Sequence, residues 1–320
     1  MPETRSPRKG SKGVWPRKRA SRMYPSIDSW RETDECKPLA FAGYKAGMTQ
    51  VTMKDLRKTS PTKNQIISVP VTVIDTPPLL VLGARSYKRT VDGLNVLEEI
   101  GASGEDIPKK LRDKVAFAEK DGFEEGDGEE VRLIVCTQPY RSGLGKKSPE
   151  VFEVPLGGSF EEQKEYAEEK IGEELEVEDL FEEGEFIDAI SVTKGKGYEG
   201  PVKRYGATVD RRKDENPRHV GSMGSRGQGR VLHTAPQPGQ HGFHRRTDEC
   251  KHLLGTFDAE DVNPEDGFNN YGLVKESSVL VKGSVPGPEK RLVIFRNSIK
   301  KGSKLPVEIK DINTSSKQGV

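Results

Sequence analysis

Histidine, arginine and glutamine are concentrated in one stretch of the chain, and these residue types can ligate a metal, transfer a proton or bind a polyanion. The stretch covers residues 191–252, and its densest part, Gly221–Arg246, reads GSMGSRGQGRVLHTAPQPGQHGFHRR. It has few apolar residues and no lasting helical or strand periodicity, so it cannot form a core of its own. We therefore expect an outside partner to order it. The content of Arg and Gly favours a polyanion that the backbone approaches closely.

The histidines of this stretch raise the question of a metal site. All five histidines of the protein lie here: His219, His233, His241, His244 and His252. With Cys250 they are residue types that hold zinc, but no two of them have the spacing of a zinc finger. Arg245 and Arg246 would also place positive charge beside the cation. Histidines that hydrogen-bond to or stack on RNA explain the same residues better, so we predict no metal and no cofactor.

Nucleotide binding and catalysis are less well supported by the sequence. GSMGSRGQG, at 221–229, lacks the GK[ST] ending of a phosphate-binding loop, and no apolar strand leads directly into it. The same absence argues against a translation factor, which would need a nucleotide-binding domain. The carboxylates of 98–188 are too dense for one acid/base pair to stand out, and GxSxG is absent. We predict that the protein is not an enzyme. The alternative is an RNA-acting enzyme with the His-rich loop as its active site, although only Asp248 and Glu249 lie close by.

Charge is strongly segregated along the chain, although the formal net charge is only +1. Met1–Arg22 has eight Lys or Arg and one Glu, and 191–252 has thirteen basic and six acidic residues. Between them, Glu98–Asp188 has eleven basic and twenty-eight acidic residues. Two basic segments around an acidic one predict one face for a polyanion and another for solvent.

The N-terminal segment, residues 1–38, is predicted to be an extended arm. Its run SPRKGSKGVWPRKRASR alternates cations with Gly, Pro and Trp15. Lys and Arg would neutralise phosphates while Trp15 stacks on a base. A solvated tail or a targeting signal is the alternative, but Trp is unexpected in a purely solvating tail.

A second cationic feature follows a predicted strand, in the run SVTKGKGYEGPVKRYG at 191–206. Lys194 and Lys196 lie on a Gly-rich turn, which would suit a phosphate clamp, and the basic run Arg211-Arg212-Lys213 follows. An ordinary charged hairpin tip is the alternative reading.

The cysteine content and hydropathy indicate the compartment. The three cysteines, Cys36, Cys136 and Cys250, are widely spaced with no CxxC pair, which argues against a disulfide framework. No apolar run approaches the roughly 18 residues of a membrane span, and the basic N-terminus lacks the apolar region of a signal peptide. We expect an intracellular, cytoplasmic protein.

The elements that must position these residues are mainly β-strands. Short β-branched runs predict strands near 39–43, 48–53, 66–75, 79–86, 131–137, 186–192, 273–282 and 290–296. Helices are predicted at 108–120 and at 159–171, where Ser159 and Glu162 fit a capping box. Distant strands that close on each other across 87–185 predict a small β-barrel interrupted by an acidic α/β insertion.

Five motifs, in order along the chain, resemble one known family. They are FAGYKAGMT (41–49), VTVIDTPPLLVLG (71–83), SVTKGKGYEGPVKRYG (191–206), PGQHGFHRRT (238–247) and VLVKGSVPGPEKRLVIFR (279–296). The chain resembles ribosomal protein L3 of the large subunit, in its archaeal and eukaryotic branch and more on the archaeal side. The matches run from the N-terminal arm to the last strands.

The resemblance implies a structural constituent of the large ribosomal subunit that binds 23S rRNA directly, early in assembly. It implies a translation-protein type β-barrel with an inserted α/β domain, a long basic N-terminal arm and a long internal loop that extends toward the peptidyl-transferase centre. The partners would be rRNA and neighbouring large-subunit proteins, with no membrane and no small-molecule substrate. The predicted domains are an arm at 1–38, a barrel at 39–86, 186–206 and 253–320, an insertion at 87–185 and a loop extension at 207–252.

The sequence departs from the family at the tip of this loop, residues 225–233. Relatives commonly have Trp-His-Pro there and a second Trp a few residues later, whereas this chain has SRGQGR at 225–230 and His233. Arg226 and His233 are therefore expected to stack in place of an aromatic wedge. The full set of predicted RNA-binding residues is Arg8, Lys9, Lys12, Trp15, Arg17, Lys18, Arg19, Arg22, Lys45, Lys194, Lys196, Lys203, Arg204, Arg211, Arg212, Lys213, Arg218, His219, Arg226, Gln228, Arg230, His233, Gln240, His241, His244, Arg245 and Arg246.

Overall fold

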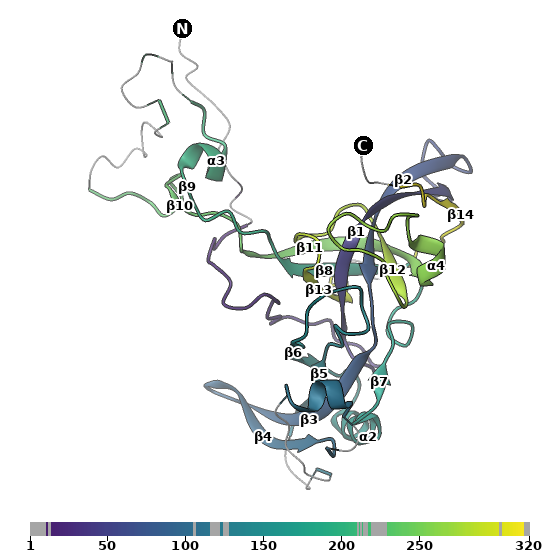
Figure 1. Ribbon diagram of the computed structural model, residues 1–320. Helices are drawn as coiled ribbons and strands as arrows, with labels where there is room; N and C mark the ends of the chain where they lie inside the picture. Colours follow the sequence, from purple (N-terminus) through teal and green to yellow (C-terminus); the bar gives the residue numbers. More distant parts are fainter. Residues whose placement is uncertain are drawn as a thin grey trace. The chain divides into compact units, whose positions relative to one another are not determined.

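The computed structural model describes residues 11, 14–104, 107–115, 122–123, 128–209, 211, 213, 217–218, 229–300 and 303–316. The chain divides into two compact units (Figure 1). The first comprises Met1–Met23 and Val192–Arg246 and is called the cationic unit here. The second comprises Tyr24–Ser191 and Thr247–Val320 and is called the main unit. None of the helices in the described ranges is long and apolar enough to span a membrane.

The larger sheet of the main unit has seven strands. They are β1 (Ala40–Lys54), β2 (Ile66–Asp75), β8 (Phe186–Val192), β11 (Arg245–Phe257), β12 (Ser278–Lys282), β13 (Leu292–Asn297) and β14 (Ile309–Ile312). Their order is β13-β8-β11-β12-β2-β1-β14, and β13 also pairs antiparallel with β1, with Phe41 opposite Phe295. Six of the strands therefore form a closed path of hydrogen-bonded neighbours. A short helix, α4 (Ala259–Val262), follows β11.

Apolar side chains inside this path form the core. All seven residues of β8, FIDAISV, are buried, as expected of a strand that is covered on both faces. Phe41, Tyr44, Ile74 and Phe295 are among the largest fully buried side chains. Burying each of them stabilises the fold by roughly 1.5–3 kcal/mol.

The second sheet has five strands and one covering helix. The strands are β3 (Leu79–Thr90), β4 (Gly93–Gly101), β5 (Glu130–Cys136), β6 (Val151–Pro155) and β7 (Glu174–Leu175), in the order β4-β3-β5-β6 with β7 beside β3. Helix α2 (Phe160–Lys170) begins at a capping box formed by Ser159 and Glu162, as predicted. Its buried Gln163 accepts a hydrogen bond from the Val131 amide over 2.8 Å. This bond fixes the helix on strand β5.

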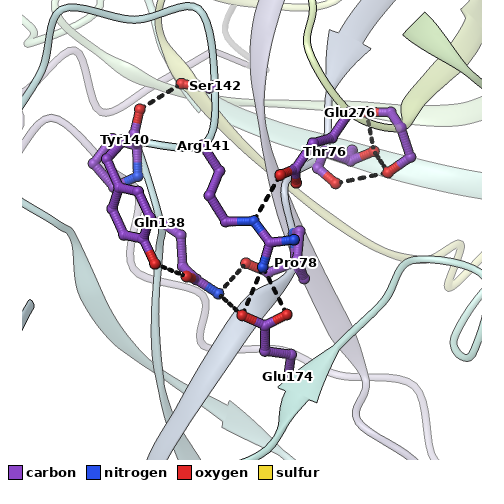
Figure 2. Close-up of polar contacts among 10 residues, drawn as sticks. Thr76, Pro78, Gln138, Tyr140, Arg141, Ser142, Glu174 and Glu276 are labelled. Atoms are coloured by element: carbon purple, nitrogen blue, oxygen red, sulfur yellow. Dashed lines mark hydrogen bonds and ion pairs between the residues drawn. The ribbon is translucent and has the colours of Figure 1, made fainter. Parts of the chain in front are cut away.

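Arg141 links segments of the main unit that are distant in sequence (Figure 2). Its guanidinium lies 2.6 Å from Oε1 of Glu174, on β7, and 2.6 Å from Oε1 of Glu276, just before β12. Gln138 donates to the Pro78 carbonyl over 3.2 Å and to Glu174 over 2.8 Å. One guanidinium therefore connects the five-stranded sheet to the segment that enters the larger sheet.

Several predicted elements differ from the structure. The strands expected at 39–43 and 48–53 are one strand, because the irregularity between Lys45 and Gly47 shifts the register of β1 against β2 without ending the pairing. The helix expected at 108–120 is only α1 (Lys109–Arg112), with Leu111 buried, and residues 116–120 lie outside the described ranges. The strand expected at 273–282 begins at Ser278. Strands β4, β6, β7, β11 and β14 of the two sheets lie outside the predicted strands.

Candidate nucleic-acid interface

Two chain segments of the cationic unit, 193–199 and 239–244, pair with each other. The amide of Thr193 donates to the His244 carbonyl over 3.0 Å, and the amide of Lys196 donates to the His241 carbonyl over 2.9 Å. The pairing continues in β9 (Tyr198–Glu199) and β10 (Gly239–Gln240). Residues 239–244, which lie within the predicted loop extension, are therefore held by backbone hydrogen bonds to the segment 193–199 that precedes it.

Gly242 permits this close approach of the two backbones. Its φ of +72° lies in the left-handed region, and a Cβ there would be 2.1 Å from the Lys194 carbonyl oxygen. No other residue fits this position without displacing the backbone of the neighbouring segment at Lys194.

A short helix of the cationic unit carries a buried aromatic residue, Tyr205. Helix α3 (Pro201–Tyr205) has Pro201 in its first turn and ends at Gly206, whose φ is +69°. This arrangement is the usual one at helix ends, where Pro fits the first turn and Gly the left-handed position after the last. Tyr205 is buried at the end of the helix, and α3 lies beside β9 and β10 (Figure 1).

The N-terminal arm contacts the paired segments 193–199 and 239–244, called the loop segments here, through its backbone. It contacts helix α3 through one guanidinium. The amide of Ala20 donates to the Phe243 carbonyl over 2.8 Å, and Nδ1 of His244 lies 2.8 Å from the Lys18 carbonyl oxygen. The Arg17 guanidinium lies over the Tyr205 ring at 4.1 Å. The arm and the loop segments therefore form one packed unit.

Two of the predicted phosphate ligands hold this unit together. Arg17 donates to the Arg204 carbonyl over 3.1 Å. Arg204 donates to the carbonyls of Gln237, over 2.8 Å, and Gln240, over 3.0 Å. Both guanidinium groups therefore position the backbone, yet these acceptors are neutral and leave their positive charge in place.

Most of the other predicted cations of this unit are exposed. They are Lys18, Arg19, Arg22, Lys194, Lys196, Lys203, Arg211, Lys213, Arg218, Arg230 and Arg245. Lys203 lies 3.7 Å from the Glu199 carboxylate, and Arg19 lies over the Phe243 ring at 5.9 Å. Arg246 is partly buried, and burial lowers its pKa. The cationic unit thus has a surface rich in positive charge, and guanidinium groups of the arm contact two of its aromatic rings, Tyr205 and Phe243.

The histidines and Gln240 differ in what they can contact. Burial and the neighbouring Lys196 lower the pKa of His241, and burial likewise lowers the pKa of the buried His244. The Gln240 amide donates to the carbonyls of His241 and Gly242. His233, by contrast, is exposed, with its ring 5.4 Å from that of Trp15. Among the three described histidines of this unit, His233 is therefore the one with an exposed ring and an aromatic neighbour, the partly buried Trp15.

The remaining predicted residues lie elsewhere. Lys45 belongs to the main unit, where its ammonium donates to the carbonyls of Val285, over 2.7 Å, and Gly287, over 3.0 Å, and burial lowers its pKa. Its amine is directed into the protein. Seven predicted residues lie outside the described ranges: Arg8, Lys9, Lys12, Arg212, His219, Arg226 and Gln228.

Sequence reasoning missed Tyr205, Phe243 and Gly242. A signal for the first was present, because Pro201 and Gly206 enclose five residues in the Pro-first, Gly-last pattern of a short helix. The cation–π contacts themselves depend on the arm, which is far away in sequence, and no local pattern reveals them.

The structure defines a mainly β protein with a cation-rich unit built from its N-terminal arm and an internal segment. Among the residues it describes, no group of three or more His, Cys, Asp or Glu is placed to hold a metal ion. The family model described as Ribosomal protein L3 matches residues 1–125 and 113–319. The chain belongs to the ribosomal protein L3 family.

Individual relatives support this assignment over the whole length. The chain is 45% identical to the large ribosomal subunit protein uL3 of Methanothermobacter thermautotrophicus and 44% identical to that of Methanosphaera stadtmanae, over 100% of both chains in each case. It is 43% identical to the protein of the same name from Archaeoglobus fulgidus, over 98% of both chains. The resemblance predicted from five motifs is confirmed.

Proposed function

We propose that this chain is a structural component of the large ribosomal subunit that binds 23S rRNA through its cationic unit. Family membership makes it a structural protein and not an enzyme, and places it in the large ribosomal subunit of the cytoplasm. Neighbouring large-subunit proteins are its further partners. The alternative of an RNA-acting enzyme has no specific support from the described site.

The observation that carries the rRNA proposal is the set of exposed cations on a unit with few carboxylates. Eleven predicted Lys and Arg side chains are exposed there, from Lys18 in the arm to Arg245 at the end of the loop segments. Each phosphate that such a cation neutralises releases counterions from the RNA, so binding becomes stronger and strongly salt-dependent.

We further propose how the fold serves this role. The closed path of six strands is the translation-protein type β-barrel. The inserted α/β domain, predicted at 87–185, begins earlier, at Leu79, because the whole of β3 belongs to the five-stranded sheet, and its acidic surface faces solvent. Of the arm predicted at 1–38 and the extension predicted at 207–252, the parts in the cationic unit, up to Met23 and up to Arg246, enter the RNA toward the peptidyl-transferase centre. Because the extension lacks a core of its own, its ordering is coupled to binding during early assembly.

The test is binding of the full-length protein to a 23S rRNA transcript over a series of salt concentrations. About ten phosphate contacts would make the affinity fall by orders of magnitude over a few-fold rise in salt. A slope of log K against log salt near zero would contradict the proposal. Sedimentation of the native protein with large subunits at moderate salt is the matching measurement in a lysate.

A further inference from the structure

A cavity of about 620 Å³ opens within the cationic unit, between the arm at residues 15–18 and the loop segment at 231–238. This volume is in the range of small-ligand sites, about 300–1,000 Å³. Helix α3 contributes Arg204 and Tyr205 to its wall. The sequence predicted RNA contacts for several of these lining residues but not that they enclose a cavity.

One side of the cavity offers aromatic and apolar surface. The rings of Trp15 and His233 are 5.4 Å apart with an interplanar angle of 55°, so they are tilted and do not cover each other's faces. Val231 and Leu232, which are both exposed, line the same cavity. A flat, uncharged ring would find both a stacking surface and an apolar contact here.

The other side of the cavity is positively charged. Arg17, Lys18 and Arg204 line it, and no Asp or Glu is present among the described lining residues. Arg17 and Arg204 donate to backbone carbonyls, which are neutral acceptors and do not cancel their charge. The cavity therefore combines a stacking surface with uncompensated cations at short range.

We propose that this cavity binds one unpaired nucleotide of an RNA, with its base against Trp15 and His233 and its phosphate toward Lys18 and Arg204. A nucleotide fits because it joins a flat π surface to an anion through a short sugar, and unstacked bases are what proteins commonly recognise in RNA. Gln237, also in the lining, can hydrogen-bond to a base edge. The inference rests on the proposed function, since it names the part of the RNA that this unit recognises.

The test compares two RNA hairpins of equal length, one fully paired and one with a single bulged adenosine. Full-length protein carrying Trp30→Phe has Trp15 as its only tryptophan, so its fluorescence reports the cavity directly. We expect the bulged hairpin to quench Trp15 and to bind about tenfold more tightly than the paired one, as one stacked base typically provides. His233→Ala should reduce that preference.

Lys203→Ala is the matched control, because Lys203 is exposed on the same unit but does not line the cavity. It should weaken both hairpins equally and leave the Trp15 quenching unchanged. His233 is an exposed side chain, so its removal tests the site without disturbing the buried contacts of Arg17 and Tyr205.

The outcomes separate this inference from the proposed function. Equal, salt-dependent binding of both hairpins without quenching would overturn the nucleotide site and leave RNA binding intact. Failure of both hairpins and of the rRNA transcript to bind would overturn both proposals. Equal quenching of Trp15 by the paired and the bulged hairpin, with equal affinity, would also overturn the unpaired nucleotide.

Discussion

The hydroxyl of Tyr271 donates a hydrogen bond of 2.5 Å to Oδ2 of Asp75, and both side chains are buried in the main unit. Burial raises the pKa of Asp75 to about 6, although the hydrogen bond from Tyr271 opposes the shift. Asp75 is the last residue of β2 and lies opposite Ser278 of β12. The core beside the seven-stranded sheet therefore contains a carboxyl group, that of Asp75, whose raised pKa of about 6 makes it lose its proton near that pH.

This group makes stability depend on pH in a defined direction. Because the pKa of Asp75 is raised in the folded state, its contribution to stability is fully present below pH 3.8 and is lost as the pH rises through about 6. Asp75→Asn removes the titration but keeps an acceptor for Tyr271. We expect the stability of the variant, relative to the native protein, to increase by up to about 3 kcal/mol between pH 4 and pH 7.

Urea unfolding of both proteins at each pH measures this difference, in which the other titrating groups cancel. A difference that stays constant from pH 4 to pH 7 would refute the shift. Tyr271→Phe is the complementary variant, since loss of its hydrogen bond should raise the pKa of Asp75 further and move the loss of stability to higher pH.

The Arg141 bridge predicts a second stability effect. Its guanidinium contacts both oxygens of Glu174, at 2.6 and 2.7 Å, and also Glu276 at 2.6 Å (Figure 2). Lysine keeps the charge but cannot contact both carboxylates in this geometry. We expect Arg141→Lys to lower the free energy of unfolding by about 1 kcal/mol, because the side chain is about one third exposed.

Lys310→Gln is the control for Arg141→Lys. Lys310 forms one surface pair with Glu308 at 2.7 Å, and its side chain is half exposed. Its loss should cost at most a few tenths of a kcal/mol. Equal effects of the two substitutions in denaturant unfolding would show that Arg141 does not join the two sheets.

The sequence predicted the strands whose apolar runs are uninterrupted and missed those whose burial depends on distant partners. Ile66–Asp75 and Phe186–Val192 appear with the expected bounds, since the apolar and β-branched residues of VTVID and FIDAISV favour a buried strand. Strand β4 has mostly exposed or partly buried residues and is held by pairing with β3, so no alternation marks it. Strand β11 begins within the polar run that was assigned to the loop.

At the candidate site, the sequence indicated the residue types but not their separate roles. Arg17 and Arg204 look the same in sequence as Lys194 and Lys196, yet the first two are engaged with Tyr205 and with carbonyls while the last two are exposed. The distinction depends on how the arm packs against α3, nearly two hundred residues away. Composition alone cannot supply it.

This distinction gives a third prediction, on salt dependence. We expect Lys196→Ala to weaken 23S rRNA binding and to reduce the slope of log K against log salt by about 1, since Lys196 is exposed and available to one phosphate. Lys45→Met should leave the slope unchanged, because its ammonium bonds to the carbonyls of Val285 and Gly287. It should instead lower the free energy of unfolding by about 1–3 kcal/mol. A reduced slope in Lys45→Met together with an unchanged slope in Lys196→Ala would place Lys45 in the RNA interface.

Two glycines with similar φ angles, Gly242 and Gly197, provide a matched test of the close backbone approach between the two paired segments. Gly242 has φ +72° and Gly197 has φ +68°, so an alanine at either position is strained by about 1–2 kcal/mol. A Cβ on Gly242 would also lie 2.1 Å from the Lys194 carbonyl, whereas a Cβ on Gly197 would meet no atom within 4 Å.

Gly242→Ala should therefore separate the paired segments, and Gly197→Ala should only strain them. The amides of Lys196 and Phe243 donate to the His241 and Lys194 carbonyls. In Gly242→Ala, but not in Gly197→Ala, we expect hydrogen exchange at these two amides to be faster than in the native protein. Affinity for 23S rRNA should fall more in this variant than in Gly197→Ala, because the cations on both segments lose their fixed spacing. Equal exchange rates and equal affinities in the two variants would mean that backbone strain at the glycine, and not the close approach of the two segments, determines how stably these segments pair.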